Sequence, residues 1–155
     1  MKQNVKKALR FTAAALPVAA LAGLLVGGYM FDGYGPDMQA EILAQIGSYG
    51  TFLAVTAVQS TVYAAVCGFL GHLMAGKLGL MRPFRFEKEK LLSALALTVL
   101  CGVVFALDPW LFGRVIPEVA ASYDAGISAS YFFGSILYGG VVEEILLRLF
   151  FMSLL

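Results

Sequence analysis

The sequence predicts an all-α, polytopic membrane protein with about four membrane-spanning helices. Hydrophobic residues make up 60% of the chain and charged residues 14%, whereas soluble domains contain about 45–50% and 25%. A helix needs about 20 predominantly apolar residues to cross a bilayer. Four stretches reach or approach this length, at residues 11–30, 51–75, 91–107 and 129–155. The lipid bilayer is therefore the first predicted partner.

The N-terminal stretch joins a basic segment to a long apolar run. Four of the first ten residues are Lys or Arg, and residues 11–30 are largely apolar. Ala20-Leu-Ala22 matches the small-residue pattern of a signal-peptide cleavage site, so a cleaved signal peptide is one interpretation. The apolar run continues past this site to Phe31, which favours a first membrane helix that is retained.

The connections between the predicted spans differ in positive charge, and this difference predicts the orientation. Residues 31–50 contain no Lys or Arg, residues 76–90 contain five, and residues 108–128 contain one. The positive-inside rule then places the N-terminus in the cytoplasm, and we expect a bacterial cytoplasmic membrane. Residues 36–46 have the length of a short interfacial helix. Residues 81–86 resemble an interfacial anchor, which favours the membrane surface over nucleic acid as the partner of the basic loop.

The last predicted span carries three charges in an otherwise apolar run. Glu143, Glu144 and Arg148 lie within residues 129–155. Each such charge costs at least about 2.5–3.5 kcal/mol at the centre of a bilayer. A helix that served only as an anchor would not carry them, so they indicate a functional site. The alternative is a structural charge cluster that holds helices together.

Helical spacing distinguishes the two acids. Glu144 and Arg148 are four residues apart, so they share a helix face and are expected to form an ion pair. Glu143 lies about 100° further round and has no partner in this helix. Ser135 and Gly139 lead up to Glu143 at four-residue spacing. Because small residues allow membrane helices to approach closely, we expect Glu143 to face the protein interior.

The sequence Glu143-Glu144-x-x-x-Arg148, preceded by Gly-Gly-Val-Val, resembles motif one of the CPBP family. These are the CAAX-protease and bacteriocin-processing (Abi) intramembrane endopeptidases. The resemblance implies intramembrane proteolysis, with Glu143 activating water and with Glu144 and Arg148 supporting it as further catalytic residues. It implies a membrane-associated peptide or a prenylated protein as substrate. It implies no cofactor, although the older metalloprotease naming of the family leaves a divalent metal open. Leu149 stands where many members have glycine.

Two further motifs of the CPBP family contain histidines and should follow motif one. The only histidine of this chain, His72, precedes it, and we interpret His72 as a packed or interfacial residue. We therefore expect the chain to be the N-terminal portion of a longer protease, inactive without the C-terminal helices of the same protein. In this view residues 1–128 are N-terminal helices and loops, and residues 129–155 are the first helix of the catalytic core.

Two other function classes remain open. The chain is a non-catalytic membrane protein, such as an immunity or scaffold component, if the charges only pack helices. It is a proton-coupled carrier if Glu143 relays protons.

The two cysteines, Cys67 and Cys101, fall within predicted spans and lack the spacing of metal ligands. We expect them to be small buried thiols.

Overall fold

The computed structural model describes residues 2–81, 86–117 and 128–155, and this part of the chain is built from helices without a β-strand. The all-α class predicted from composition is therefore confirmed. The helices form two compact units. The first, called the three-helix unit below, combines Met1–Met81 with Ser128–Leu155, and the second is Arg82–Ile127.

Among the residues that the structure describes, three helices are long and apolar enough to cross a membrane, which is compatible with an integral membrane protein. They are α1 (Lys2–Gly33), α3 (Tyr49–Lys77) and α4 (Lys88–Ala106), the last followed by the short α5 (Asp108–Leu111). Each covers all or nearly all of one of the first three predicted spans. α1 begins in the basic segment because Lys and Arg are good helix formers and their charges remain outside the apolar run.

A short helix, α2 (Pro36–Ile46), lies in the first connection, at the residues where a short helix was predicted. The side-chain amide of Gln39 donates hydrogen bonds to the backbone carbonyls of Phe31 and Tyr34, both at 3.0 Å. These bonds satisfy carbonyl groups at and just after the end of α1, where the helical ladder has no further donors. Gly47 ends α2 at a φ of 93°, a conformation that glycine adopts without strain.

The fourth apolar stretch forms one continuous helical run. It consists of α7 (Ala129–Leu137), η1 (Tyr138–Phe151) and α8 (Met152–Leu154), and all three charges lie in η1. η1 is a π-helix, in which each hydrogen bond spans five residues. Sequence patterns predicted ordinary α-helical spacing here. π-Helices are rare and occur mostly as single-turn bulges, so a 14-residue π-helix is unusual, and it is the segment that carries the three charges.

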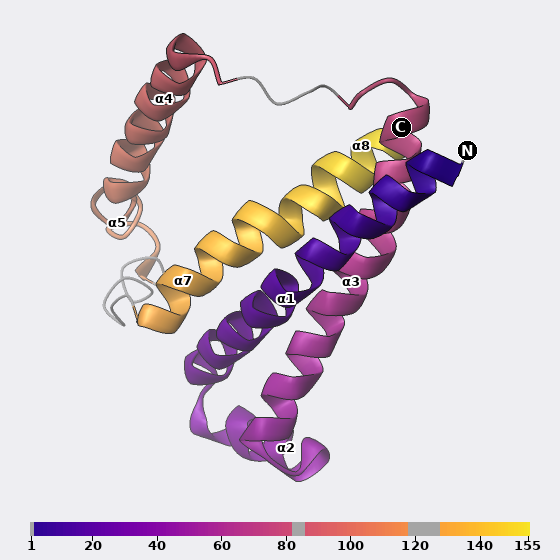
Figure 1. Ribbon diagram of the computed structural model, residues 1–155. Helices are drawn as coiled ribbons and strands as arrows, with labels where there is room; N and C mark the ends of the chain where they lie inside the picture. Colours follow the sequence, from indigo (N-terminus) through magenta and orange to yellow (C-terminus); the bar gives the residue numbers. More distant parts are fainter. Residues whose placement is uncertain (1, 82–85, 118–127) are drawn as a thin grey trace. The chain divides into compact units, whose positions relative to one another are not determined.

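In the three-helix unit, α1, α3 and the run from α7 to α8 pack side by side (Figure 1). Their contacts depend on small residues, as is usual between membrane helices. A Cβ atom added to Gly23 of α1 would lie 2.6 Å from the backbone oxygen of Thr56 in α3. One added to Gly134 of α7 would lie 3.3 Å from the backbone of Leu25. The buried core is correspondingly small, and its members are Ala15, Ala19, Ala22, Ala64, Val142 and Ile145.

Large apolar side chains cover the outside of the helices. On α3, an exposed stripe runs along Val55, Val58, Val62 and Val66. In the second unit, α4 has no buried residue at all. Helices that are apolar on their exposed faces suit lipid or other helices as surroundings rather than water.

The second unit contains α4 and α5, and the guanidinium of Arg114 lies 4.9 Å from the centre of the Trp110 ring. Residues 82–85 and 118–127 lie outside the described residues. They include most of the predicted interfacial anchor at 81–86 and the end of the second polar connection.

Candidate functional site

The ion pair predicted from the four-residue spacing is present in η1. Nη1 of Arg148 lies 3.0 Å from Oε2 of Glu144. The side chains are 75% and 45% exposed, respectively. The pair is thus well formed but accessible, and its free donors and acceptors face outward.

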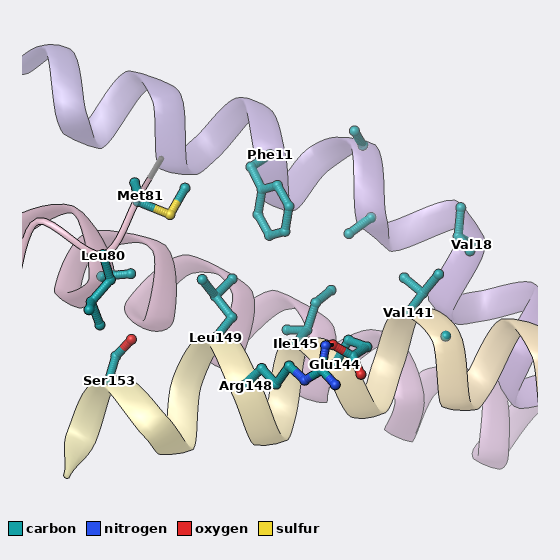
Figure 2. A pocket seen from close by; sticks show the side chains of 14 residues that line it. Phe11, Val18, Leu80, Met81, Val141, Glu144, Ile145, Arg148, Leu149 and Ser153 are labelled. Atoms are coloured by element: carbon teal, nitrogen blue, oxygen red, sulfur yellow. Dashed lines mark ion pairs between the residues drawn. The ribbon is translucent and has the colours of Figure 1, made fainter. Parts of the chain in front are cut away.

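The Glu144–Arg148 pair borders an apolar groove of about 580 Å³, which lies between α1, the end of α3 and η1. Figure 2 shows Phe11 and Val18 reaching down from α1 toward Val141 and Ile145 of η1. Leu80 and Met81, just after α3, line one end of the groove. The groove has the size of an ordinary ligand site. Its lining is apolar apart from Glu144, Arg148, Ser153 and backbone groups.

Glu143 lies elsewhere on the helix, and the expectation that it faces the protein interior is wrong for the described unit. Its side chain is exposed, and it does not line the groove. The buried residues of η1 are Val142 and Ile145. An added Cβ at Gly139 would lie 3.7 Å from Oε2 of Glu143, so the carboxylate lies beside Gly139 on the same helix.

Glu143 is exposed because the close contacts between helices form at other residues. The backbone of η1 approaches α3 at Gly71, where an added Cβ would lie 2.8 Å from the carbonyl oxygen of Leu149. The glycines that admit neighbouring helices therefore include Gly71 of α3 and Gly23 of α1. Along the Ser135–Gly139 stripe of the last helix, Ser135 is exposed and Gly139 is half-buried within the three-helix unit.

His72 is packed between helices, as the sequence favoured. Its ring stacks on Phe11, with 5.3 Å between ring centroids and 28° between ring planes. Its Nδ1 atom is buried without a hydrogen-bond partner in the described structure. No hydrogen bond or ion pair joins His72 to Glu143, and His72 does not line the groove. The structure thus brings Glu144 and Arg148 together and leaves Glu143 and His72 at other places.

The cysteines match the prediction only in part. Both lie in apolar helices, but only Cys67 is partly buried, against the core of the three-helix unit. Cys101 is exposed on α4, so its predicted burial is wrong for the described unit. Within its own unit, α4 has no buried residue. Among residues 2–81, 86–117 and 128–155, no cluster of three or more His, Cys, Asp or Glu side chains is placed to hold a metal ion.

The groove itself was not predicted. Its lining comes from α1, the end of α3 and η1, and nothing in the sequence indicates which faces of these helices remain apart. The only local signal was the Glu144–Arg148 pair at its edge.

Comparisons with protein-family models, curated proteins and solved structures find no match for this chain. Its function must therefore be inferred from its own residues and their arrangement.

Proposed function

We propose that the chain contributes the water-activating acid of an intramembrane endopeptidase of the CPBP type. In this proposal Glu143 is the general base, and Glu144 and Arg148 support it. The observation that carries the proposal is the 3.0 Å ion pair. It neutralises Glu144 and leaves the adjacent Glu143 as an exposed carboxylate with no ion pair in the described part of the chain.

The chemistry follows from this division of roles. Glu143 takes a proton from water, the resulting hydroxide attacks the peptide carbonyl, and the proton then passes to the leaving amine. The negative charge on the carbonyl oxygen needs hydrogen-bond donors. These donors, and a second acid or base, must come from groups that cover the exposed face of η1. The expected source is a set of partner helices that carry histidines, as the later motifs of the family do.

A fourth membrane crossing and a defined orientation complete the proposal. The run from α7 to α8 is the fourth span, and the N-terminus is cytoplasmic because most of the positive charge lies on that side. A rise of about 1.5 Å per residue from Ala129 places Glu143 at most about 21 Å into the bilayer, in its cytoplasmic half. A peptide segment near the cytoplasmic surface is therefore the substrate class.

The orientation is tested by cysteine labelling. Cys67 and Cys101 are first replaced by alanine, and Asp37→Cys or Glu87→Cys is then introduced singly. An impermeant thiol reagent added to intact cells is expected to modify Asp37→Cys in α2 and to leave Glu87→Cys, before α4, unmodified. Both should react once the membrane is made permeable. Labelling of Glu87→Cys alone in intact cells would contradict a cytoplasmic N-terminus.

The proposed activity is tested on the protein as it is expressed in its own membrane, purified together with the helices and partners that accompany it. A set of membrane-embedded peptides with cleavable segments near the cytoplasmic surface is added in liposomes. We expect hydrolysis that yields two fragments, whose masses sum to that of the peptide plus one water. The absence of hydrolysis over the whole set would contradict the proposal.

One observation favours a second candidate, a non-catalytic scaffold. Polar groups are exposed on apolar helices of the three-helix unit. On α3, the amide of Gln59 donates a 2.9 Å hydrogen bond to the hydroxyl of Tyr63, and both side chains are exposed. Glu143 is exposed on η1. Such groups suit a contact with another membrane helix. A stable complex that hydrolyses none of the peptides is the result expected for the scaffold.

A further inference from the structure

The groove beside the Glu144–Arg148 pair runs along the helices that line it. It follows the helices, from Val18 and Val141 at one end to Ser153 and Met81 at the other (Figure 2). Helices that cross a bilayer run roughly along its normal, which is also the mean direction of acyl chains. Its apolar lining favours an apolar occupant. An acyl chain can therefore lie in the groove without a change in its direction.

The polar edge of the groove determines which headgroup fits. The 3.0 Å contact joins one nitrogen of Arg148 to one oxygen of Glu144. An arginine has five N–H donors, and a carboxylate has about four acceptor positions. Both groups therefore keep unused hydrogen-bonding capacity beside the groove. Because the pair is neutral overall, a purely anionic headgroup would be attracted by Arg148 and repelled by Glu144. A headgroup with both charges would be attracted by both residues.

We propose that the groove binds a phospholipid whose headgroup carries a phosphate and a primary ammonium, as in phosphatidylethanolamine. The phosphate accepts hydrogen bonds from the free guanidinium nitrogens of Arg148, a geometry that arginine favours. The ammonium donates to the free oxygen of Glu144, and one acyl chain lies between Val18 and Val141. This binding involves no peptide cleavage, so it holds or fails independently of the proposed endopeptidase activity.

The test measures which lipid the protein retains. The protein is reconstituted into vesicles with equal amounts of phosphatidylethanolamine, phosphatidylcholine and phosphatidylglycerol that have the same acyl chains. It is then extracted into mild detergent, and bound lipid is identified by native mass spectrometry. We expect phosphatidylethanolamine to be retained about three- to tenfold over phosphatidylcholine, whose trimethylated nitrogen cannot donate to Glu144. Phosphatidylglycerol should also be retained less, because it lacks the ammonium.

Variants assign the retained lipid to the groove. Glu144→Gln should remove most of the preference for phosphatidylethanolamine over phosphatidylcholine, and Arg148→Met should lower the retention of all three. Val141→Trp fills the groove and should lower retention, whereas Leu147→Trp, on the exposed face of the same helix, is the matched control and should not. Melting temperatures of all variants identify any that fail to fold.

Several results would overturn the proposal. Equal retention of the three lipids by the wild-type protein would show that the headgroup is not recognised. Stronger retention of phosphatidylglycerol would show that Arg148 acts alone on an acidic lipid. Equal loss of lipid in Val141→Trp and Leu147→Trp would place the bound lipid outside the groove. The wild-type comparison requires no variant, so the proposal can be contradicted even if a substitution prevents folding.

Discussion

Replacing Gly71 with alanine is expected to destabilise the three-helix unit by about 1–3 kcal/mol. The added Cβ would lie 2.8 Å from the carbonyl oxygen of Leu149 and 2.9 Å from Cα of Phe150. Both are backbone atoms, so they cannot turn aside as a flexible side chain could. The last helix must shift away from α3, and the buried contacts of Val142 and Ile145 loosen with it.

Gly76 provides the matched control. It lies in the same helix, α3, and an added Cβ there would meet no atom within 4 Å. Alanine is the better helix former, so Gly76→Ala is expected to be neutral or to stabilise by up to about 1 kcal/mol. Thermal unfolding of both variants in one detergent gives the comparison. Equal melting temperatures for Gly71→Ala and Gly76→Ala would show that η1 does not pack on α3 at this point.

Sequence patterns predicted much of the helical framework. Long apolar runs predicted α1, α3 and α4, because a membrane-spanning helix needs about 20 predominantly apolar residues. Residues 36–46 were predicted to form a short helix and they form α2, which has proline at its start and glycine after its end. The Glu144–Arg148 pair followed from four-residue spacing alone, a local property that survives the change from an α-helix to a π-helix.

The buried face of the last helix could not be predicted in the same way. A helix rich in apolar and small residues can pack through several of its faces, and the sequence of the helix alone does not distinguish them. The small residues Ser135 and Gly139, which precede Glu143 at four-residue spacing, led to the prediction that Glu143 is buried. In the structure, Val142 and Ile145 are buried instead, because Gly71 on another helix provides the close contact. The groove and the exposure of Cys101 likewise depend on which helices meet.

Replacing Glu143 with glutamine is expected to lower the rate of peptide cleavage strongly. Glu143→Gln keeps the size of the side chain and its hydrogen-bonding atoms but removes the group that accepts a proton. A general base typically contributes about 10²–10⁴-fold to a rate, so peptide cleavage by the assembled protein should fall by at least this factor. The melting temperature should change little, because the Glu143 side chain is exposed and makes no ion pair in the described part of the chain.

Glu41→Gln is the matched control for this change. It removes the same charge from an exposed carboxylate, but on α2, in the first connection. Cleavage by Glu41→Gln should equal that of the wild-type protein. A similar loss in both variants would indicate a general effect of charge on membrane insertion or folding.

The cleavage rate of Glu143→Gln, measured beside wild type and Glu41→Gln at equal amounts of folded protein, tests the proposed role of Glu143 most directly. The expected result is loss of hydrolysis in Glu143→Gln alone, with all three melting temperatures alike. Hydrolysis by Glu143→Gln at a rate close to that of wild type would contradict the assignment of Glu143 as the base.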